Sequence, residues 1–415
     1  MPVRKTTKAP SRSKSQTFTF KQTIAVPPAE AYRMFTHSTA WRDWFCDWAD
    51  VSARVDGILH LHWESGHYVA GQFLKLEPGK KIVFTWDGKG EPEPTRVTVT
   101  FVAKGDKTKV TVSHQGIGTG SKWTRTTHGV REGWTNGLEN LKSVLETGID
   151  LRVARRPRLG IFIGDFNPAI AKQLGVPGHD GIRLDGTAKG SGAQASGLQK
   201  DDVIVKFAGK NVSVGSLGSV VRNYKAGDKV PVVFYRGSQK MAAQLELSKF
   251  PVTDVPATAA ELADTMRTVY AELGAAWKKA VKGLTEAEAD HKEGKEWSVK
   301  ELIAHFIAGE RDYQSWAANM LRDNETNDSL EFRPNMDERL RAIVARFKTV
   351  RGLLDELKGA GAESVDLLAN LPDSFVARKH LYRRVALWAL EFTTTHFHDE
   401  HGAQLQAAIA AAKQN

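Results

Sequence analysis

Apolar and polar residues alternate with a period of two through most of residues 18–148. Residues 96–101 and 109–114 both alternate in this way, and turn-forming residues occupy positions 104–107 between them. Alternation at period two places every second side chain on one face of a strand, so these segments predict a β-hairpin. Residues 81–86 predict a further strand. The first third of the chain is therefore expected to contain an antiparallel sheet.

Two helices are expected in the same region. One is predicted near residues 29–36, directly after Pro27 and Pro28, because proline suits the first turn of a helix. A longer amphipathic helix is predicted from about residue 120 to residue 145. A strand, a helix, a run of antiparallel strands and a long final helix indicate an α+β domain over residues 17–149.

The pattern changes twice further along the chain. A basic, proline-containing stretch at residues 152–158 precedes a region of glycines and short β-type runs that extends to residue 249. Residues 250–257 form a second linker, and from residue 258 onward apolar residues recur with the helical period of about 3.6. This last region is predicted to contain about four helices. Three breaks separate them, at residues 292–295, 322–335 and 371–373.

The composition is typical of a globular protein with several domains. The chain has 415 residues, of which 41% are hydrophobic and 26% are charged, and this length predicts about three domains. No apolar run approaches the roughly 18–20 residues that cross a bilayer, and no apolar stretch follows the basic N-terminal residues. The single cysteine, Cys46, cannot form an internal disulfide and suits a reducing compartment. A cytoplasmic protein without membrane contact is therefore expected.

The net charge of +10 raises the question of an anionic partner. Much of the positive charge lies within residues 1–16, which contain no acidic residue and are predicted to form a basic, disordered tail. Elsewhere basic and acidic residues are interspersed, and no helix-turn-helix, zinc-finger or RNA-binding aromatic motif is present. Nucleic acid is therefore not favoured as a partner.

A family resemblance in the first domain is carried by residues 24–35, 69–86 and 95–100 and by Arg131-Glu-Gly-Trp134. In this order the segments resemble the Aha1-C-like branch of the START-like (SRPBCC) superfamily. The resemblance implies a helix-grip fold, in which a curved sheet and a long helix enclose a hydrophobic cavity for an apolar small molecule or a protein segment. Four aromatic residues are candidates for lining that cavity, or alternatively for forming the core: Trp63, Tyr68, Trp86 and Trp134. Three histidines offer either a metal site or part of the solvated face, and the solvated face is favoured: His60, His62 and His67.

The middle region carries Arg158-Leu-Gly-Ile-Phe162 and a glycine-containing run over residues 190–210. These motifs resemble a PDZ domain of the bacterial type, which implies a mostly-β domain over residues 152–249. Such a domain binds a peptide C-terminus or an exposed strand by strand addition, while backbone amides of a loop hold the terminal carboxylate. No serine-protease motif accompanies them, and a structural spacer without a ligand is the alternative. The positions that match the binding loop and strand are Leu159, Gly160, Ile161 and Phe162.

The C-terminal region contains a segment from Trp297-Ser to His305-Phe and a second over residues 395–404. These segments resemble the DinB-like superfamily, which implies an all-α four-helix bundle over residues 258–415 and a divalent metal ion held by three histidines. Ser298 followed by Glu301 predicts a capping box at the start of a helix.

The candidate metal ligands are His305, His398 and His401. His398 and His401 are three residues apart and share one face of an α-helix, although the family's commoner spacing of four meets Phe397 instead. His396 lies on a different face of a regular helix, and only an irregular helix would bring it in. Three nitrogen ligands with open positions suit zinc, nickel or iron.

Taken together, these interpretations predict a multidomain protein with an α+β helix-grip domain, a mostly-β PDZ domain and an all-α four-helix bundle. The leading hypothesis is a cytoplasmic binding protein that combines a hydrophobic cavity, a peptide-binding module and a divalent-metal site. The alternative is an enzyme, a metal-dependent hydrolase or thiol-dependent transferase centred on the histidines. Glu310 and Asp399 are then either supporting acid–base residues or plain surface charges. The catalytic residues are left open, and the sequence is compatible with an oligomer.

Overall fold

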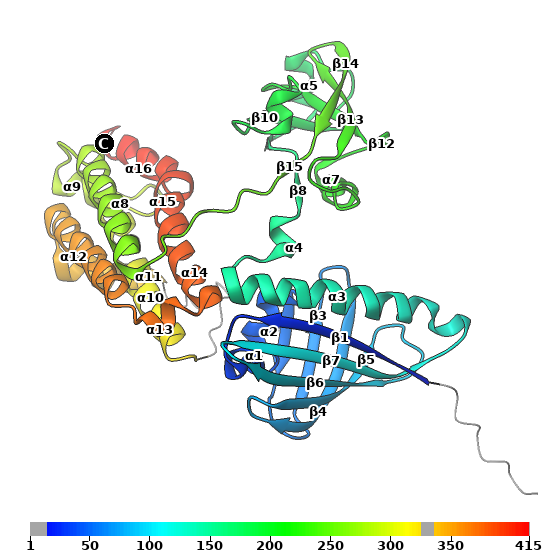
Figure 1. The fold of residues 1–415 in the computed structure, drawn as a ribbon. Coiled ribbons are helices and arrows are strands. Elements are labelled where there is room, and N and C mark those ends of the chain that lie inside the picture. The colour runs from blue at the N-terminus through cyan, green and yellow to red at the C-terminus, as the bar shows by residue number, and fades with distance from the viewer. Residues whose placement is uncertain (1–14, 325–335, 415) are drawn as a thin grey trace, which may run out of the picture. The chain divides into compact units, whose positions relative to one another are not determined.

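The computed structural model describes residues 15–324 and 336–414 (Figure 1). Residues 1–14 of the predicted basic tail and residues 325–335 of a predicted break lie outside the described residues. Within the described part of the chain, no helix combines the length and the apolar character that crossing a membrane requires.

The first part of the chain forms a seven-stranded antiparallel sheet in the order β1-β7-β6-β5-β4-β3-β2. The predicted hairpin is confirmed, because β6 pairs with β7 from the turn between Lys104 and Lys107. The strand predicted over residues 81–86 is confirmed as β5. The strands are β1 (Ser15–Ile24), β2 (Trp48–Val51), β3 (Ile58–His62), β4 (Tyr68–Glu77), β5 (Lys81–Gly88), β6 (Thr95–Lys104) and β7 (Lys107–Gly118).

Three helices accompany this sheet: α1 (Pro28–Arg33), α2 (Ser38–Trp44) and α3 (Thr124–Thr147). The long helix α3 packs against the sheet, which confirms the helix predicted over residues 120–145 (Figure 1). Alternation along the strands buries one face of the sheet, with Val97 of β6 and Val112 of β7 fully enclosed. Burying each such side chain contributes about 1.5–3 kcal/mol, so the alternation determines which face is covered. The arrangement is consistent with the predicted helix-grip fold.

Residues 149–253 contain a six-stranded sheet in the order β14-β13-β11-β10-β9, with β12 paired to β11. The short β-type runs predicted for this region are confirmed as strands. A separate two-stranded pair is formed by β8 (Pro157–Arg158) and β15 (Ser248–Lys249), and α4 (Leu151–Ala154) precedes it. The remaining elements are β9 (Ile161–Gly164), α5 (Pro168–Leu174), β10 (Ile182–Thr187), α6 (Gly192–Ala195), β11 (Val203–Phe207), β12 (Lys210–Asn211), α7 (Val214–Val221), β13 (Lys229–Arg236) and β14 (Gln239–Glu246).

The described residues after residue 258 are mostly helical, as predicted. The predicted capping box is confirmed, because the Ser298 hydroxyl accepts from the N–H of Glu301 at 3.2 Å and the Glu301 carboxylate accepts from the N–H of Ser298 at 2.9 Å. The helices are α8 (Ala259–Ala280), α9 (Glu286–Asp290), α10 (Val299–Leu321), α11 (Met336–Phe347), α12 (Val350–Ala369), α13 (Asp373–Val376), α14 (Lys379–Leu387), the π-helical η3 (Trp388–Phe392), α15 (Thr393–Thr395), the π-helical η4 (His396–Glu400) and α16 (Gly402–Gln414).

A break between α11 and α12 differs from the prediction, which treats this stretch as one helix. Lys348 has a positive φ of 60°, and the Thr349 hydroxyl caps α12 by accepting from the N–H of Gly352 at 3.0 Å. The carbonyl of Lys348 accepts from the buried ammonium of Lys300 at 2.9 Å, and Asp290 accepts from the same ammonium at 2.7 Å. A buried cation requires such acceptors. A residue of another helix therefore contributes to stabilising the break.

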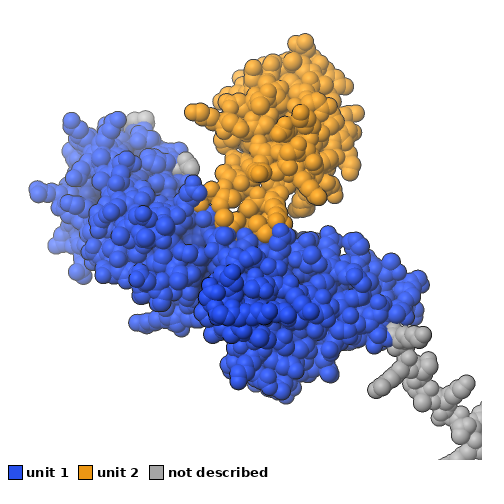
Figure 2. All heavy atoms as spheres, viewed as in Figure 1, with its two compact units in different colours: residues 1–148, 254–415 blue, residues 149–253 orange. Residues whose placement is uncertain are grey.

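The chain divides into two compact units, residues 1–148 with 254–415 and residues 149–253 (Figure 2). The first and the last of the three predicted parts therefore share one unit. Within this unit α14 packs against α3. Arg378 forms ion pairs with Glu30 and with Asp323, each at 3.0 Å. These partners are far apart in the sequence, and for this reason periodicity does not reveal the contact.

Candidate metal centre

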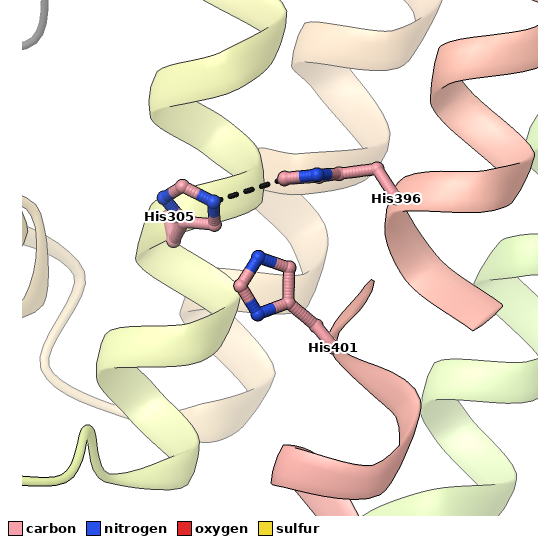
Figure 3. Close-up of side chains that lie close together, drawn as sticks. All are labelled: His305, His396 and His401. Carbon is pink, nitrogen blue, oxygen red and sulfur yellow. Dashed lines mark hydrogen bonds between the residues drawn. The ribbon is translucent and has the colours of Figure 1, made fainter. Parts of the chain in front are cut away.

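Three histidine side chains from two regions of the helical bundle meet in its interior: His305, His396 and His401 (Figure 3). One potential ligand nitrogen of each lies within 4.8 Å of the other two. His305 projects from α10 and is buried, as is His396, whereas His401 is half-buried. His396 and His401 stand at the two ends of the η4 turn.

Nε2 of His305 and Nε2 of His396 are 2.9 Å apart. The centroid of the His401 ring lies 4.8 Å from that of His305 and 4.6 Å from that of His396. Two nitrogens that each bind one ion at about 2.1 Å, at right angles, lie about 3.0 Å apart. The spacing therefore fits two ligands of one ion, and it also fits an N–H···N hydrogen bond between neutral imidazoles.

Two polar side chains orient the rings. Oε2 of Glu400 lies 2.8 Å from Nδ1 of His396, and Oε1 of Gln404 lies 2.8 Å from Nδ1 of His401. Because both oxygens accept hydrogen bonds, each Nδ1 carries a proton, and in the neutral tautomer with this proton the lone pair is on Nε2. Metal-binding histidines are oriented by the same kind of contact.

An irregular turn brings His396 and His401 to the same face. In a regular α-helix, residues five apart are about 140° apart around the axis. In η4, however, the N–H of His401 donates to the carbonyl of His396 at 3.2 Å, which is the hydrogen bond of a π-helix. The wider turn places both rings beside His305.

His398 does not join the cluster, so this part of the sequence prediction is wrong in its geometry. Its side chain is exposed and lies against the ring of Phe397. The prediction assumed α-helical spacing, in which residues three apart share a face, and the π turn changes that face. His396, the alternative candidate, occupies the position instead. The side chain of Asp399 lies outside the described residues.

Aromatic rings enclose the three histidines. Trp297 lies over His305 at 4.9 Å between ring centroids and stacks on His401 at 6.1 Å. Phe306 contacts all three imidazoles, with centroid distances of 4.9–5.8 Å. Such an apolar shell restricts water and strengthens the interaction of a ligand set with an ion. Three neutral imidazoles with open positions fit zinc, nickel or iron.

The four aromatic residues predicted for the first domain occupy different environments. Trp86 and Trp134 lie in the packed core, where Phe45 stacks on Trp134 at 5.0 Å. Trp63 is half-buried, and its Nε1 donates to the carbonyl of Phe45 at 2.8 Å. Tyr68 is 47% exposed, because the next residue of β4, Val69, takes the inward position. Tyr68 therefore does not belong to the core. The prediction of a solvated face is confirmed for His60 and His62, whose side chains are exposed, whereas His67 is half-buried beside the ring of Trp63.

A buried histidine that the sequence interpretation does not single out links these rings. Nε1 of Trp134 donates to Nδ1 of His114 at 3.1 Å, and Nε2 of His114 donates to the hydroxyl of Thr95 at 2.7 Å. The hydroxyl of Thr95 donates in turn to the carbonyl of Trp86 at 3.1 Å. Burial lowers the pKa of His114 to about 3, so the ring is neutral at pH 7. His114 lies two residues after the buried Val112 in β7, so the period-two alternation of the strand is the sequence signal that indicates its burial.

The residues predicted to bind a peptide lie at an edge of the sheet of residues 149–253. Ile161 and Phe162 belong to β9, the last strand in the sheet order, and Leu159 is buried before it. Gly160 has a φ of 76°, and a Cβ added there would lie 2.1 Å from Cβ of Ser191. Only glycine fits this position.

Two family models match the chain. Residues 25–146 match the model of the activator of Hsp90 ATPase homolog 1-like protein, and residues 270–405 match the DinB superfamily. The chain therefore contains an Aha1-like, SRPBCC-fold domain and a DinB-like domain, as both resemblances predict. This combination fits a multidomain binding protein.

Individual relatives cover shorter parts. The human activator of 90 kDa heat shock protein ATPase homolog 1 is 33% identical over 101 residues, which is 24% of this chain and 29% of that protein. A probable periplasmic serine endoprotease DegP-like from Hahella chejuensis is 27% identical over 118 residues, or 28% of this chain and 24% of that protein, and partly covers the middle region. The chain thus spans 29% and 24% of the lengths of these relatives. The crystal structure of an HSP90 activator from Plasmodium falciparum shows 26% identity and a TM-score of 0.27, covering 31% of this chain and 95% of that one.

Proposed function

We propose that the protein is a cytoplasmic multidomain binding protein whose helical bundle holds one divalent metal ion through His305, His396 and His401. The observation that carries this proposal is the convergence of three histidine nitrogens within 4.8 Å of one another. Glu400 and Gln404 support it, because they leave a lone pair on Nε2 of two of the rings. A bound zinc, nickel or iron ion would supply Lewis acidity and open coordination positions at this place.

Removing a ligand is expected to abolish stoichiometric metal binding. Full-length protein is incubated separately with zinc, nickel and iron(II), freed of excess ion, and measured by elemental mass spectrometry. We expect about one equivalent in the wild type and a small fraction of it in His305→Ala and His396→Ala, because two ligands rarely hold such an ion. Glu400→Ala should weaken binding about 10–100-fold, since it loses only the orienting contact.

His398→Ala is the matched control for these variants, because it removes an exposed imidazole two residues from His396. It should keep the full metal content. Equal metal in His305→Ala and the wild type would contradict the proposed site. Loss of metal in His398→Ala together with retention in His396→Ala would show that His398 is the ligand, as regular helical spacing predicts.

We also propose that the middle domain binds an extended peptide along β9. The free edge of this strand supports the proposal, together with the exposed side chain of Phe162 and the glycine that the backbone requires at position 160. A strand edge offers backbone N–H and C=O groups to a peptide, and neighbouring loop amides suit its carboxylate. The 27% identity to the DegP-like endoprotease is a further support.

A charge at Phe162 is expected to weaken peptide binding by at least about tenfold, since an ionised side chain is costly against apolar ligand residues. The probe is a fluorescent library of decapeptides with free, apolar C-termini, measured by anisotropy on the full chain with Phe162→Asp. Val102→Asp is the control, because Val102 in β6 has the same exposed fraction of 53%. An unchanged signal in Phe162→Asp, or equal binding of amidated peptides, would contradict carboxylate recognition beside β9.

For the first domain we favour a protein segment over an apolar small molecule. Trp86, Trp134 and Phe45 fill the space between the sheet and α3 with packed rings, which supports a surface partner more than an interior ligand. The identity to an activator of a heat shock protein ATPase supports a protein partner of that class.

A further inference from the structure

A second site lies in the helical bundle, beside the histidine cluster. A cavity of about 530 Å³ opens between α8, α10, α12 and the segment that begins with α15. Its wall is formed largely by apolar side chains, among them Leu273, Trp277, Phe306, Leu357, Val365 and Phe397. This volume is in the range of small-molecule sites. Phe306 contacts the three imidazoles as well, so its ring separates the two sites.

One carboxyl group, that of Glu310, lies in this apolar wall. The hydroxyls of Tyr270 and Ser364 each donate to its Oε2 at 2.7 Å. Nε2 of Gln314 donates to the Ser364 oxygen at 3.1 Å, which directs the serine proton toward Glu310. Oε2 is therefore fully used as an acceptor, and neither hydrogen bond involves Oε1.

The charge of Glu310 has no cationic partner among the described residues. Burial raises the pKa of its carboxyl group, which reflects the cost of holding an unpaired anion in an apolar wall. A buried carboxylate is stabilised when a cation pairs with it. The other charged residues of the cavity are exposed at its rim and carry both signs: Arg267, Lys278, Lys358, Asp355 and Asp366. The rim therefore does not favour a ligand of either charge, whereas the Glu310 carboxylate in the interior favours a cation.

We propose that this cavity binds a small apolar amine, with its ammonium group on Oε1 of Glu310 and its hydrocarbon or aromatic body against Trp277, Phe306 and Phe397. An ammonium supplies the charge and the donors that Glu310 lacks, and aromatic faces attract a cation as well as an apolar body. The site does not depend on a metal at the histidine cluster.

Calorimetric titration of the full chain with phenylbutylamine tests the proposal, and phenylbutanol is the uncharged probe of nearly the same shape. We expect the amine to bind at least about tenfold more tightly than the alcohol, because a charge-assisted hydrogen bond is stronger than a neutral one. Glu310→Gln should remove this difference, since the amide keeps an acceptor for Tyr270 and Ser364 but loses the charge. His305→Ala should bind the amine as the wild type does.

A pair of glycine variants tests whether the probes bind inside the cavity or elsewhere on the protein. A Cβ at Gly274 or at Gly359 meets no atom within 4 Å, but Gly274 lines the cavity and Gly359 lies exposed on α12. Gly274→Phe should therefore block both probes, while Gly359→Phe should leave their binding unchanged. Circular dichroism confirms that the variants are folded. Equal affinity for amine and alcohol, undiminished amine binding in Glu310→Gln, or binding retained in Gly274→Phe would each overturn the proposal.

Discussion

Trp134→Ala is expected to lower the free energy of unfolding of the first domain by about 3–5 kcal/mol. Trp134 is 1% exposed, stacks on Phe45 and lies 5.6 Å from the ring of Trp86. Its removal leaves a large cavity and deprives Nδ1 of His114 of its donor. Calorimetric melting of the full chain and hydrogen exchange of α3 and β7 peptides measure the loss in this domain.

Two further substitutions identify the cause of the stability loss expected in Trp134→Ala. Trp134→Phe keeps an aromatic ring but removes the Nε1 donor, so it should cost about 1–3 kcal/mol. Trp48→Ala removes an indole that is 51% exposed, and it should change stability by about 0.5 kcal/mol or less. If Trp134→Ala were no more harmful than Trp48→Ala, the Trp134 ring would line an open ligand cavity, and an interior small molecule would replace a protein segment as the expected partner.

The strands and long helices were predictable because their signals are local. Alternation in residues 96–101 and 109–114 records which side of a strand is buried, and a capping box at Ser298 depends on residues three apart. The break at Lys348 was not predictable in this way. One of its contacts is made by the buried ammonium of Lys300, which approaches from a different helix.

The candidate metal centre was predictable only in part, for the same physical reason. His305 follows a helix start that the sequence marks clearly, and His401 lies on the predicted segment. The choice between His396 and His398 depends on one backbone hydrogen bond, since an i→i+5 bond in place of i→i+4 changes which side chains face α10. No residue type specifies this bond locally. In the π turn both His396 and Phe397 are buried.

His114 makes the first domain sensitive to acid. Its pKa is lowered from 6.5 to about 3 in the folded protein, because burial disfavours the charged ring. Below pH 6.5 the unfolded chain binds a proton at this histidine that the folded chain does not bind. The free energy of unfolding is therefore undiminished by His114 above pH 6.5 and decreases as the pH falls toward 3. The loss amounts to about 1.4 kcal/mol per pH unit in this window.

His114→Gln is therefore expected to reduce the fall in stability between pH 6.5 and pH 4.5 by about 2–3 kcal/mol, since the amide does not titrate. Urea unfolding of the full chain, followed by hydrogen exchange in β6 and β7 peptides at each pH, gives the two slopes. Identical slopes in the wild type and His114→Gln would show that folding does not lower the pKa of His114, and would contradict the prediction.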